Sequence, residues 1–472
     1  MDNRFPYAPE ETQSPVPENE PLQEDFPGFL PAEDIPISDA ETLPEEFDSL
    51  LPAGDLEVQE LPALFPEEEQ PVAEPLPLFD DMEPTLVSRP KRKKRSVWRI
   101  ILSVLTFIGK WLLAAALIVA VLATGLIGYL TVTEYSPAYS EVAQRGAVNV
   151  TAAYPPEVEQ SAEAGVAVEQ PPMTLRLLSF NTGFAGLGED ADFFMDGGEM
   201  VNPESYSVVA ENMAGIEALI REQDADVLLL QEVDTGSDRT FQQNQMLHYE
   251  YKLEDYEARF ALNYSCDYVP YPLSERIGEV QSGIATYSRF NIESATRYSL
   301  PCPFSWPVRV ANLKRCLLVT RIPIRGSAQE LVIVNLHLEA YDDGEGKAAQ
   351  TAQLLKLLQE EYEKGNYVIA GGDFNQAFPG TLDTYPILDR DYWTPGLLED
   401  LPEGWKYAFD DGSPTCRLLN QPYDPSDRTT QHYVIDGFIV SPNVTIDRVE
   451  TINAGFEFSD HNPVVLDITL DS

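Results

Sequence analysis

The stretch ELVIVNLHLEAYDDGEGKAAQTAQLLKLLQEEYEKGNYVIAGGDFNQ, residues 330–376, holds two strongly apolar runs separated by an amphipathic segment. The runs ELVIVNLHL and YVIAGG are typical of buried strands. The segment KAAQTAQLLKLLQEEYEK predicts a helix that ends at Gly365, because glycine commonly follows the last turn of a helix. A strand, a helix and a second strand in succession indicate an α/β domain.

The same alternation extends outward in both directions from this stretch. SVVAENMAGIEALIRE predicts a helix with Val209, Met213, Ile216 and Ile220 on one face. Further strands are predicted at LRLLSF (175–180), DVLLLQ (226–231), GIATYS (283–288), RCLLVTRIPI (315–324), YVIDGFIVS (433–441) and VVLDITL (464–470). No solenoid-like repeat is present. Residues 174–472 are therefore expected to form one large α/β domain.

The N-terminal segment, residues 1–88, has a different composition. It carries 24 Asp and Glu residues against one Arg, and it holds 16 of the 38 prolines in the chain. Such a segment cannot bury enough apolar surface to offset the entropy of ordering, so we expect a disordered, acidic, cytoplasmic tail. A docking arm for a basic partner is the alternative.

A predicted membrane anchor follows the tail. Residues 89–99 contain seven Lys and Arg and no acid, and residues 111–130 are apolar and uncharged. Twenty such residues match the hydrocarbon core of a bilayer. We expect a basic juxtamembrane segment at 89–110, with Lys110 snorkelling to the inner interface, and a transmembrane helix at 111–132. A cleaved signal peptide is disfavoured, because about 90 residues precede the basic cluster.

The basic cluster also predicts orientation. Positive charge before the span favours a cytoplasmic N-terminus. We therefore expect the chain to cross the cell membrane once, with the residues after the span outside the cytoplasm. Residues 133–173 lack sustained periodicity and are expected to be a linker.

Polar residues interrupt or follow several of the predicted strands. They are Asn181, Glu232, His337, Asp373, Asn375, Asp436, Asp460 and His461. Each alone has an ordinary explanation as a turn former, a solvated strand end or a core histidine. Asp436 is harder to explain, because it interrupts an apolar run and an unpaired buried carboxylate is costly. Groups at strand ends of an α/β sheet converge on one rim, which predicts a shared site.

The motifs SFNTG, LLQEVD, VNLHLEA, GGDFN, VIDGFIVS and SDHNPV occur in this order. Their series resembles the endonuclease/exonuclease/phosphatase superfamily, which includes deoxyribonuclease I-like enzymes, neutral sphingomyelinases and inositol-polyphosphate 5-phosphatases. The resemblance covers residues 174–470. It implies a four-layered α/β sandwich, in which two mixed β-sheets pack face to face with helices outside. It also implies a metal-dependent hydrolase that cleaves phosphoesters.

The expected chemistry needs an activated water and a cation at the phosphoryl oxygens. His461 is the expected general base, and Asp436 resembles the carboxylate that orients it. Glu232 and Asn181 look like the principal ligands of Mg²⁺, with Mn²⁺ as an alternative, because carboxylate and amide oxygens suit a hard cation. Asp460 is expected to be a further metal ligand or to support one.

The remaining roles are also implied by the resemblance. Asp373 and Asn375 resemble the pair that orients the attacking water and contacts the phosphate. His337 resembles the family histidine that donates a hydrogen bond to a phosphoryl oxygen or assists the leaving group. Arg239 is a candidate phosphate clamp in a predicted surface turn, where a solvated arginine is an equal alternative.

The net charge of the chain beyond the basic cluster indicates which substrates are favoured. Residues 100–472 carry a net charge of −31 and no Lys/Arg-rich run, which argues against a long nucleic acid. A lipid headgroup or a small phosphoester is favoured; a nuclease, or a catalytically idle binding module, is the alternative. The four cysteines, Cys266, Cys302, Cys316 and Cys416, fit either disulfides or free buried thiols.

Overall fold

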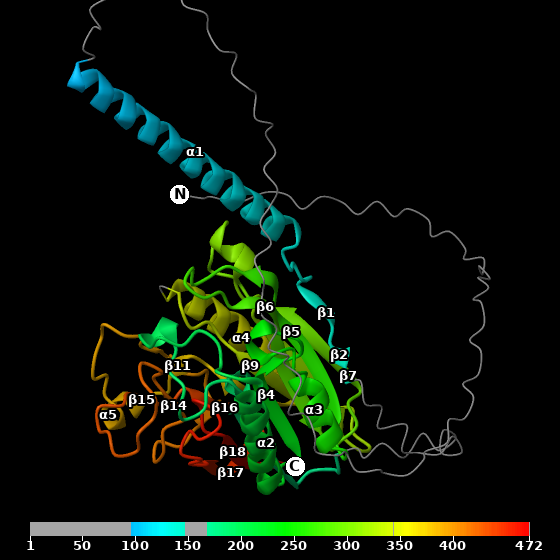
Figure 1. The fold of residues 1–472 in the computed structure, drawn as a ribbon. Coiled ribbons are helices and arrows are strands. Elements are labelled where there is room, and N and C mark those ends of the chain that lie inside the picture. Colours follow the sequence, from blue (N-terminus) through cyan, green and yellow to red (C-terminus); the bar gives the residue numbers. More distant parts are fainter. Residues whose placement is uncertain (1–95, 147–167, 343, 472) are drawn as a thin grey trace, which may run out of the picture. The chain divides into compact units, whose positions relative to one another are not determined.

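The computed structural model describes residues 96–146, 168–342 and 344–471. Figure 1 shows a long helix, α1, and a domain built on two β-sheets. The predicted tail at 1–88, the basic residues up to 95 and most of the predicted linker beyond residue 146 lie outside the described residues.

The first sheet has seven strands in the described part of the chain, in the order β1-β7-β8-β9-β10-β16-β13. β9 and β10 are parallel neighbours, and the other pairs are antiparallel. The strands are β1 (Ser140–Val142), β7 (Ser294–Ser299), β8 (Cys316–Pro323), β9 (Glu330–His337), β10 (Tyr367–Asp373), β16 (Asp436–Val440) and β13 (Lys406–Ala408).

The second sheet also has seven strands among the described residues, in the order β17-β18-β3-β4-β6-β5-β2. Here β3 and β4 are the parallel pair. The strands are β17 (Val444–Thr451), β18 (Val464–Leu470), β3 (Met173–Asn181), β4 (Val227–Asp234), β6 (Gly278–Ser288), β5 (Glu257–Val269) and β2 (Gln144–Arg145). Both sheets are therefore mixed, as the family resemblance implied.

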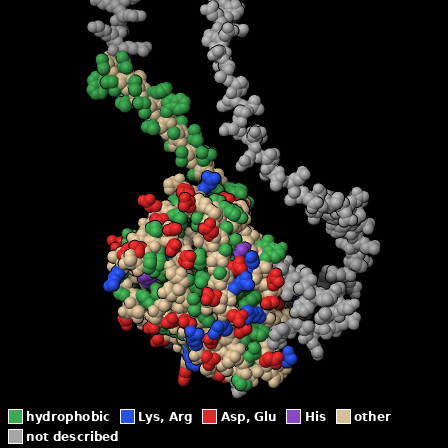
Figure 2. Space-filling view, turned by 60° about the horizontal axis from the view of Figure 1, so that its bottom comes forward, with side chains coloured by type: hydrophobic (Ala, Val, Ile, Leu, Met, Phe, Trp, Pro, Cys, Tyr) green, Lys and Arg blue, Asp and Glu red, His purple; other side chains and the backbone are tan. Residues whose placement is uncertain are grey.

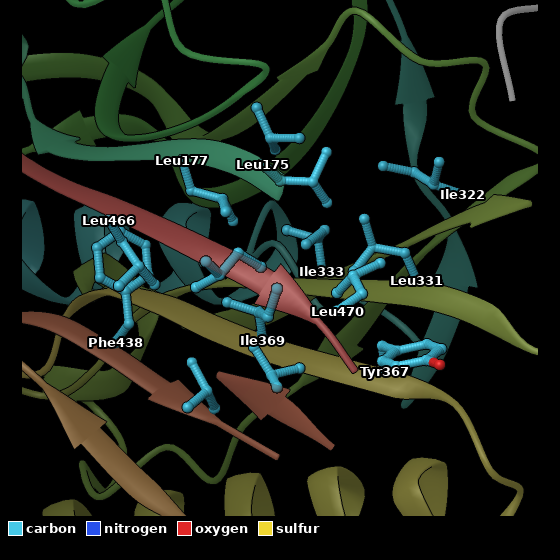
Figure 3. Close-up of a cluster of buried hydrophobic side chains, with 14 of the residues drawn as sticks. Leu175, Leu177, Ile322, Leu331, Ile333, Tyr367, Ile369, Phe438, Leu466 and Leu470 are labelled. Atoms are coloured by element: carbon cyan, nitrogen blue, oxygen red, sulfur yellow. The ribbon is translucent and has the colours of Figure 1, made fainter. Parts of the chain in front are cut away.

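The main core lies between the two sheets, where buried side chains of both meet (Figure 3). Along β3 the side chains alternate, because successive residues of a strand point to opposite faces. Leu175 and Leu177 face the other sheet. Leu178 and Phe180 pack on the opposite face, against α2 (Tyr206–Gln223) and α3 (Gln245–Lys252). The second sheet is thus buried on both faces.

A third cluster covers the outer face of the first sheet. Leu354 and Leu358 of α4 (Glu345–Glu363) pack there against strands β8 to β10. The order helix, sheet, sheet, helix confirms the four-layered α/β sandwich. The smaller elements are η3 (Gly183–Ala185), η4 (Phe194–Asp196), η5 (Asp238–Thr240), η6 (Val308–Ala311), α5 (Thr381–Thr384) and the strand pairs β11 (Gln376–Ala377) with β12 (Gly396–Leu397) and β14 (Cys416–Arg417) with β15 (His432–Tyr433).

The stretch expected to be a linker, 133–173, contributes to the domain. β1 pairs with β7 at the edge of the first sheet, and β2 pairs with β5 at the edge of the second. Both strands have two or three residues, too few to show a periodic pattern. In the structure the paired part of the domain therefore begins before residue 174, because open edges of both sheets accept short strands.

Helix α1 (Val97–Val132) runs for 36 residues without a break, from within the predicted juxtamembrane segment through the predicted span. It is the one helix in the described part of the chain with the length and composition to cross a membrane. Figure 2 shows its surface as almost entirely hydrophobic side chains. All four cysteines lie among the described residues, and each is a free thiol.

Candidate active site

Three of the predicted site residues lie side by side at one end of the first sheet. His337 ends β9, Asp373 ends β10, and Asp436 begins β16. Asp373 is the register partner of His337 in the parallel ladder and of Asp436 in the antiparallel one. The strand pairing alone therefore places the three side chains in a row.

The second sheet brings the other residues to the same place. Asn181 ends β3, and Glu232 lies in β4 at an irregularity of the ladder, with a positive φ of 54°. Asp460 and His461 precede β18, and His461 forms a bridge with Cys416. A bulge commonly re-aims a side chain near a functional site, and here it accompanies Glu232.

The Asn181 side chain connects the residues of both sheets. Its Nδ2 lies 3.0 Å from Oδ2 of Asp373, 3.3 Å from Oε1 of Glu232 and 3.5 Å from Nε2 of His461. Its Oδ1 accepts a hydrogen bond from the backbone N–H of Gly183 at 3.1 Å. In this orientation the Asn181 amide nitrogen donates to the carboxylates of Asp373 and Glu232, while its oxygen accepts from the Gly183 backbone.

His461 and Asp436 form a buried pair, with 2.8 Å between Nδ1 and Oδ2. Burial disfavours the charged imidazole, but the Asp436 carboxylate and its neighbours outweigh burial and raise the pKa of His461 well above its ordinary value. Because Nδ1 faces a carboxylate, the neutral ring carries its proton there. Nε2 is then an unprotonated base, 3.8 Å from Oδ2 of Asp460 and 3.9 Å from Oδ2 of Asp373.

His337 has the opposite electrostatic character. Its Nε2 lies 3.4 Å from Oδ2 of Asp373 and 3.9 Å from Oε1 of Glu232. Burial, with the charges of Arg315 and His461, lowers its pKa well below the ordinary value. A neutral His337 can donate one N–H to a substrate oxygen but is not a cation.

The acidic groups of the site are short of positive charge. Burial raises the pKa of Asp460 to about 6, and burial together with the charge of Asp436 raises the pKa of Asp373. Among the described residues, the ion-pair partners of these two carboxyl groups are histidines. Oδ1 of Asp436 and Nδ1 of His337 are buried without a hydrogen-bond partner in the same part of the chain. Buried carboxylates that lack a Lys or Arg partner among the described residues fit a divalent cation.

Two sets of side chains have ligand atoms within 4.8 Å of one another, namely Asp373, Asp436 and His461, and Cys416, Asp460 and His461. Burial raises the pKa of the Cys416 thiol to about 12, and a protonated thiol is a poor ligand for a hard cation. Glu232 belongs to neither set but adjoins Asp373 through Asn181 and His337. The oxygen-rich half of the site is therefore the part that fits Mg²⁺ or Mn²⁺.

Asn375 and Arg239 differ in their contacts with the residues of the site. Asn375 has a φ of 49°, its N–H donates to Oδ1 of Asp373 at 2.8 Å, and its Nδ2 donates to the Leu338 carbonyl. The guanidinium of Arg239 forms a two-pronged pair with the buried Asp234, at 2.9 and 3.0 Å, and lies 3.8 Å over the ring of Phe184. The structure thus joins Asn375 to Asp373 and engages Arg239 with internal partners.

Two residues near the site were not predicted from the sequence. The Tyr341 hydroxyl donates to Oδ1 of Asp196 at 3.2 Å. Burial raises the pKa of Asp196 to about 6, and the charges of His461 and Arg417 oppose this. Asp196 lies in η4, in a loop without periodicity, and Tyr341 lies four residues after His337, the one signal that could have pointed to it.

Several solved structures are similar to this chain. The endonuclease/exonuclease/phosphatase of Beutenbergia cavernae DSM 12333 is similar, with 20% identity, a TM-score of 0.43, and coverage of 63% of this chain and 72% of that chain. TDP2 from C. elegans has 17% identity and a TM-score of 0.38, covering 66% of this chain and 80% of that chain. ANGEL2, a 2′,3′-cyclic phosphatase, has 15% identity and a TM-score of 0.42, covering 64% and 96%.

No curated protein gives a significant match to this sequence. The family model described as "Endonuclease/Exonuclease/phosphatase family" matches residues 179–461, more than half of the chain. The match begins two residues before Asn181 and ends at His461, so it contains every residue of the site. The chain therefore belongs to the endonuclease/exonuclease/phosphatase family of phosphoester-hydrolysing enzymes.

Proposed function

We propose that the protein is a membrane-anchored, extracytoplasmic, Mg²⁺-dependent phosphohydrolase that cleaves a phosphodiester or phosphomonoester with a water activated by His461. The observation that carries this proposal is the 2.8 Å pair between His461 and Asp436, with Nε2 of His461 directed at carboxylates of both sheets. A buried histidine held by a carboxylate is suited to general-base catalysis.

In the proposed reaction, Nε2 of His461 accepts a proton from water while the water oxygen bonds to phosphorus. The bond from phosphorus to the leaving oxygen breaks, and the leaving oxygen takes a proton from solvent or from the His461 imidazolium. Asp436 stabilises the imidazolium that forms. Asp373 is proposed to orient the water, with Asn375 holding Asp373 through its backbone N–H.

Glu232, Asp460 and the amide of Asn181 are proposed to hold the metal or support its ligands. A bound divalent cation would offset charge on the phosphoryl oxygens. His337, neutral because of its lowered pKa, is proposed to donate a hydrogen bond to one of those oxygens. For Arg239, its pairing with Asp234 supports a role in holding the β4–η5 connection, so we do not include it among the substrate contacts.

The proposed location rests on α1 and on the charges before it. Residues 89–99 carry seven positive charges, and the helix that follows is long and apolar enough to span a bilayer. The proposed arrangement is an acidic cytoplasmic tail at 1–88, a basic juxtamembrane segment at 89–110, a span at 111–132 and an external catalytic domain. The net charge of −31 beyond residue 99 favours a small or lipid-borne phosphoester over a long nucleic acid.

The test is turnover by the full-length chain, in detergent, of bis-p-nitrophenyl phosphate and of lipid, sugar-phosphate and nucleic-acid substrates. We expect hydrolysis with Mg²⁺, none with EDTA, and a loss of about 10²- to 10⁴-fold in His461→Ala. His248→Ala is the matched control, because His248 lies on α3 and pairs with Glu217. Absence of Mg²⁺-dependent turnover, or full activity in His461→Ala, would contradict the proposal.

A further inference from the structure

A group of large apolar side chains is exposed on η4, on η6 and the residues just before it, and on the loop between β5 and β6. Leu273 is 95% exposed, and Tyr271, Trp306, Val308 and Met195 are between 42% and 57% exposed. We call these five residues the apolar rim. Clustered exposed apolar side chains commonly mark an interaction surface.

The last turn of α1 is bonded to the domain beside this rim. The Tyr129 hydroxyl donates to Oδ2 of Asp267 at 2.7 Å, and Nε1 of Trp306 donates to Oγ1 of Thr131 at 3.0 Å. Arg309 forms a two-pronged pair with Glu134 at 2.9 and 3.1 Å. Trp306 thus belongs to the rim and also contacts the end of the apolar helix.

Leu130 locates the contact between α1 and the domain relative to the bilayer. It is only 3% exposed and packs in a cluster with Val269, Ile277 and Val280 of the β5–β6 hairpin. If Lys110 lies at the inner interface, the twenty residues after it rise by about 30 Å, the thickness of the hydrocarbon core. The outer boundary of the bilayer then falls at Leu130, the height at which the domain carries its apolar rim.

The rim and the catalytic residues lie at the same end of the second sheet. Val233 and Asp234, directly after Glu232, pair with Gly283 and Ser282 in the middle of β6, and β4 ends there. The loop of the β5–β6 hairpin, which carries Tyr271 and Leu273, lies beyond that point. A membrane at the rim would therefore adjoin the end of the sandwich that holds the site.

Element η4 provides a second connection between the rim and the site. The Phe194 ring lies 5.3 Å from that of Tyr271, and Phe194 packs against the same cluster as Leu130. Two residues later, Asp196 accepts the hydrogen bond of Tyr341, which lies four residues after His337. One short helix therefore contacts the rim at one end and the segment that follows His337 at the other.

We propose that the apolar rim enters the outer headgroup region of the lipid bilayer and that the site acts on phosphoesters of lipid headgroups. Tryptophan and tyrosine favour this interface, and leucine, valine and methionine supply apolar area to insert below it. This inference rests on the proposed function for its anchor and its chemistry, and it adds the partner surface and the substrate class.

The first test measures where the rim lies. The full-length chain, with Cys302→Ser to remove the one thiol that is not buried, carries Leu273→Cys labelled with an environment-sensitive fluorophore in phosphatidylcholine vesicles. Tyr251→Cys is the matched control, because Tyr251 is 62% exposed and lies with Asp224 and Arg289 near the start of β4, at the other end of the sheet. We expect spin-labelled lipid to quench the label at 273 and iodide to quench the label at 251. Equal iodide quenching at both positions would overturn the proposal.

The second test separates lipid from soluble substrates. Leu273→Asp and Trp306→Asp should lower kcat/KM at least tenfold on sphingomyelin, phosphatidylglycerol or phosphatidylinositol in vesicles. They should leave turnover of bis-p-nitrophenyl phosphate unchanged, as should the control Tyr251→Asp on both substrates. Equal losses on both substrates, or wild-type turnover of the soluble diester with none on any vesicle lipid, would overturn the lipid assignment. Lipid quenching at 273 without turnover of any substrate would contradict the proposed hydrolase and support the membrane contact.

Discussion

The ionisation of His461 is set by two opposing influences. Burial removes water from the imidazolium and lowers the pKa, while the Asp436 carboxylate 2.8 Å away and the neighbouring Cys416 and Asp460 together raise it by more. A general base must be neutral to accept a proton, so a raised pKa confines activity to higher pH. kcat/KM should therefore rise as pH increases through the pKa of His461.

Replacing Asp436 by Asn tests this balance. Asp436→Asn removes the stabilising charge but keeps the shape, so the pKa of His461 should fall and the acid limb of the pH–rate profile should move to lower pH. We also expect kcat/KM at its optimum to fall by about 10²- to 10⁴-fold, because the neutral amide no longer supports the imidazolium or its tautomer. The measurement is kcat/KM against pH at saturating Mg²⁺. An acid limb that does not move would show that another group controls it.

Gly372 illustrates how a single residue without a side chain can position the site. It precedes Asp373 with a φ of 150°, and a Cβ at this position would lie 1.9 Å from the Leu336 carbonyl oxygen. Gly372→Ala should therefore lower the free energy of unfolding by more than ~3 kcal/mol, because backbone must move to relieve the contact. Thermal unfolding measures the change. Gly380→Ala is the control, since Gly380 also has a positive φ but open space around it, and should cost about 1–2 kcal/mol.

At the scale of elements, the connection between β4 and η5 depends on a buried ion pair. Asp234 is fully buried, and the Arg239 side chain is 11% exposed. Arg239→Ala would leave Asp234 without its partner, which costs about 3–5 kcal/mol for a buried pair. We expect a large fall in Tm for Arg239→Ala. At a temperature where the variant remains folded, KM should be nearly unchanged.

Arg325→Ala serves as the comparison for that variant. Its pair with Glu169 has both side chains more than 60% exposed, so the loss should be under about 1 kcal/mol. The opposite pattern for Arg239→Ala, a raised KM with an unchanged Tm, would restore the phosphate-clamp role expected from the sequence.

Periodicity predicted the central elements because burial leaves a regular signature in them. The expected helix at 347–364 is α4 at Glu345–Glu363, and the expected strand at 464–470 is β18. β5 was not predicted, although it is long, because Asn263, Ser265 and Asp267 interrupt its apolar residues. Long-range pairing partners, rather than local pattern, decide whether β1 and β2 exist as strands.

For the site, the sequence indicated which residues meet but not how they are held. The motif order predicted that His461, Asp436 and Asp373 share one site. Strand register explains why Asp373 and Asp436 meet, and His461 joins them through its 2.8 Å contact with Asp436. The positive φ of Glu232 and the amide of Asn181 between two sheets have no local signal, because both depend on the packing of distant strands. Asp196 and Tyr341 approach the site through loops 145 residues apart in sequence.

At the scale of the whole chain, charge is divided into blocks that match the proposed placement about a membrane. The first 88 residues are strongly acidic, residues 89–99 are basic, and the remainder is acidic again. Basic residues are retained on the cytoplasmic side during insertion, whereas acidic residues contribute little to orientation. The acidic blocks on either side therefore do not compete with the basic cluster.

This charge pattern predicts a definite protease-accessibility result. In intact cells, added protease should digest the catalytic domain and spare an epitope tag at the N-terminus, while permeabilised cells should lose both. Replacing Arg89, Lys91, Arg92, Lys93, Lys94 and Arg95 by Gln should raise the fraction of chains with a protected catalytic domain, because the positive charge that retains the N-terminus is removed. A catalytic domain protected in intact cells expressing the unmodified chain would reverse the orientation, and with it the expectation that the site of His461 faces the outer lipid surface.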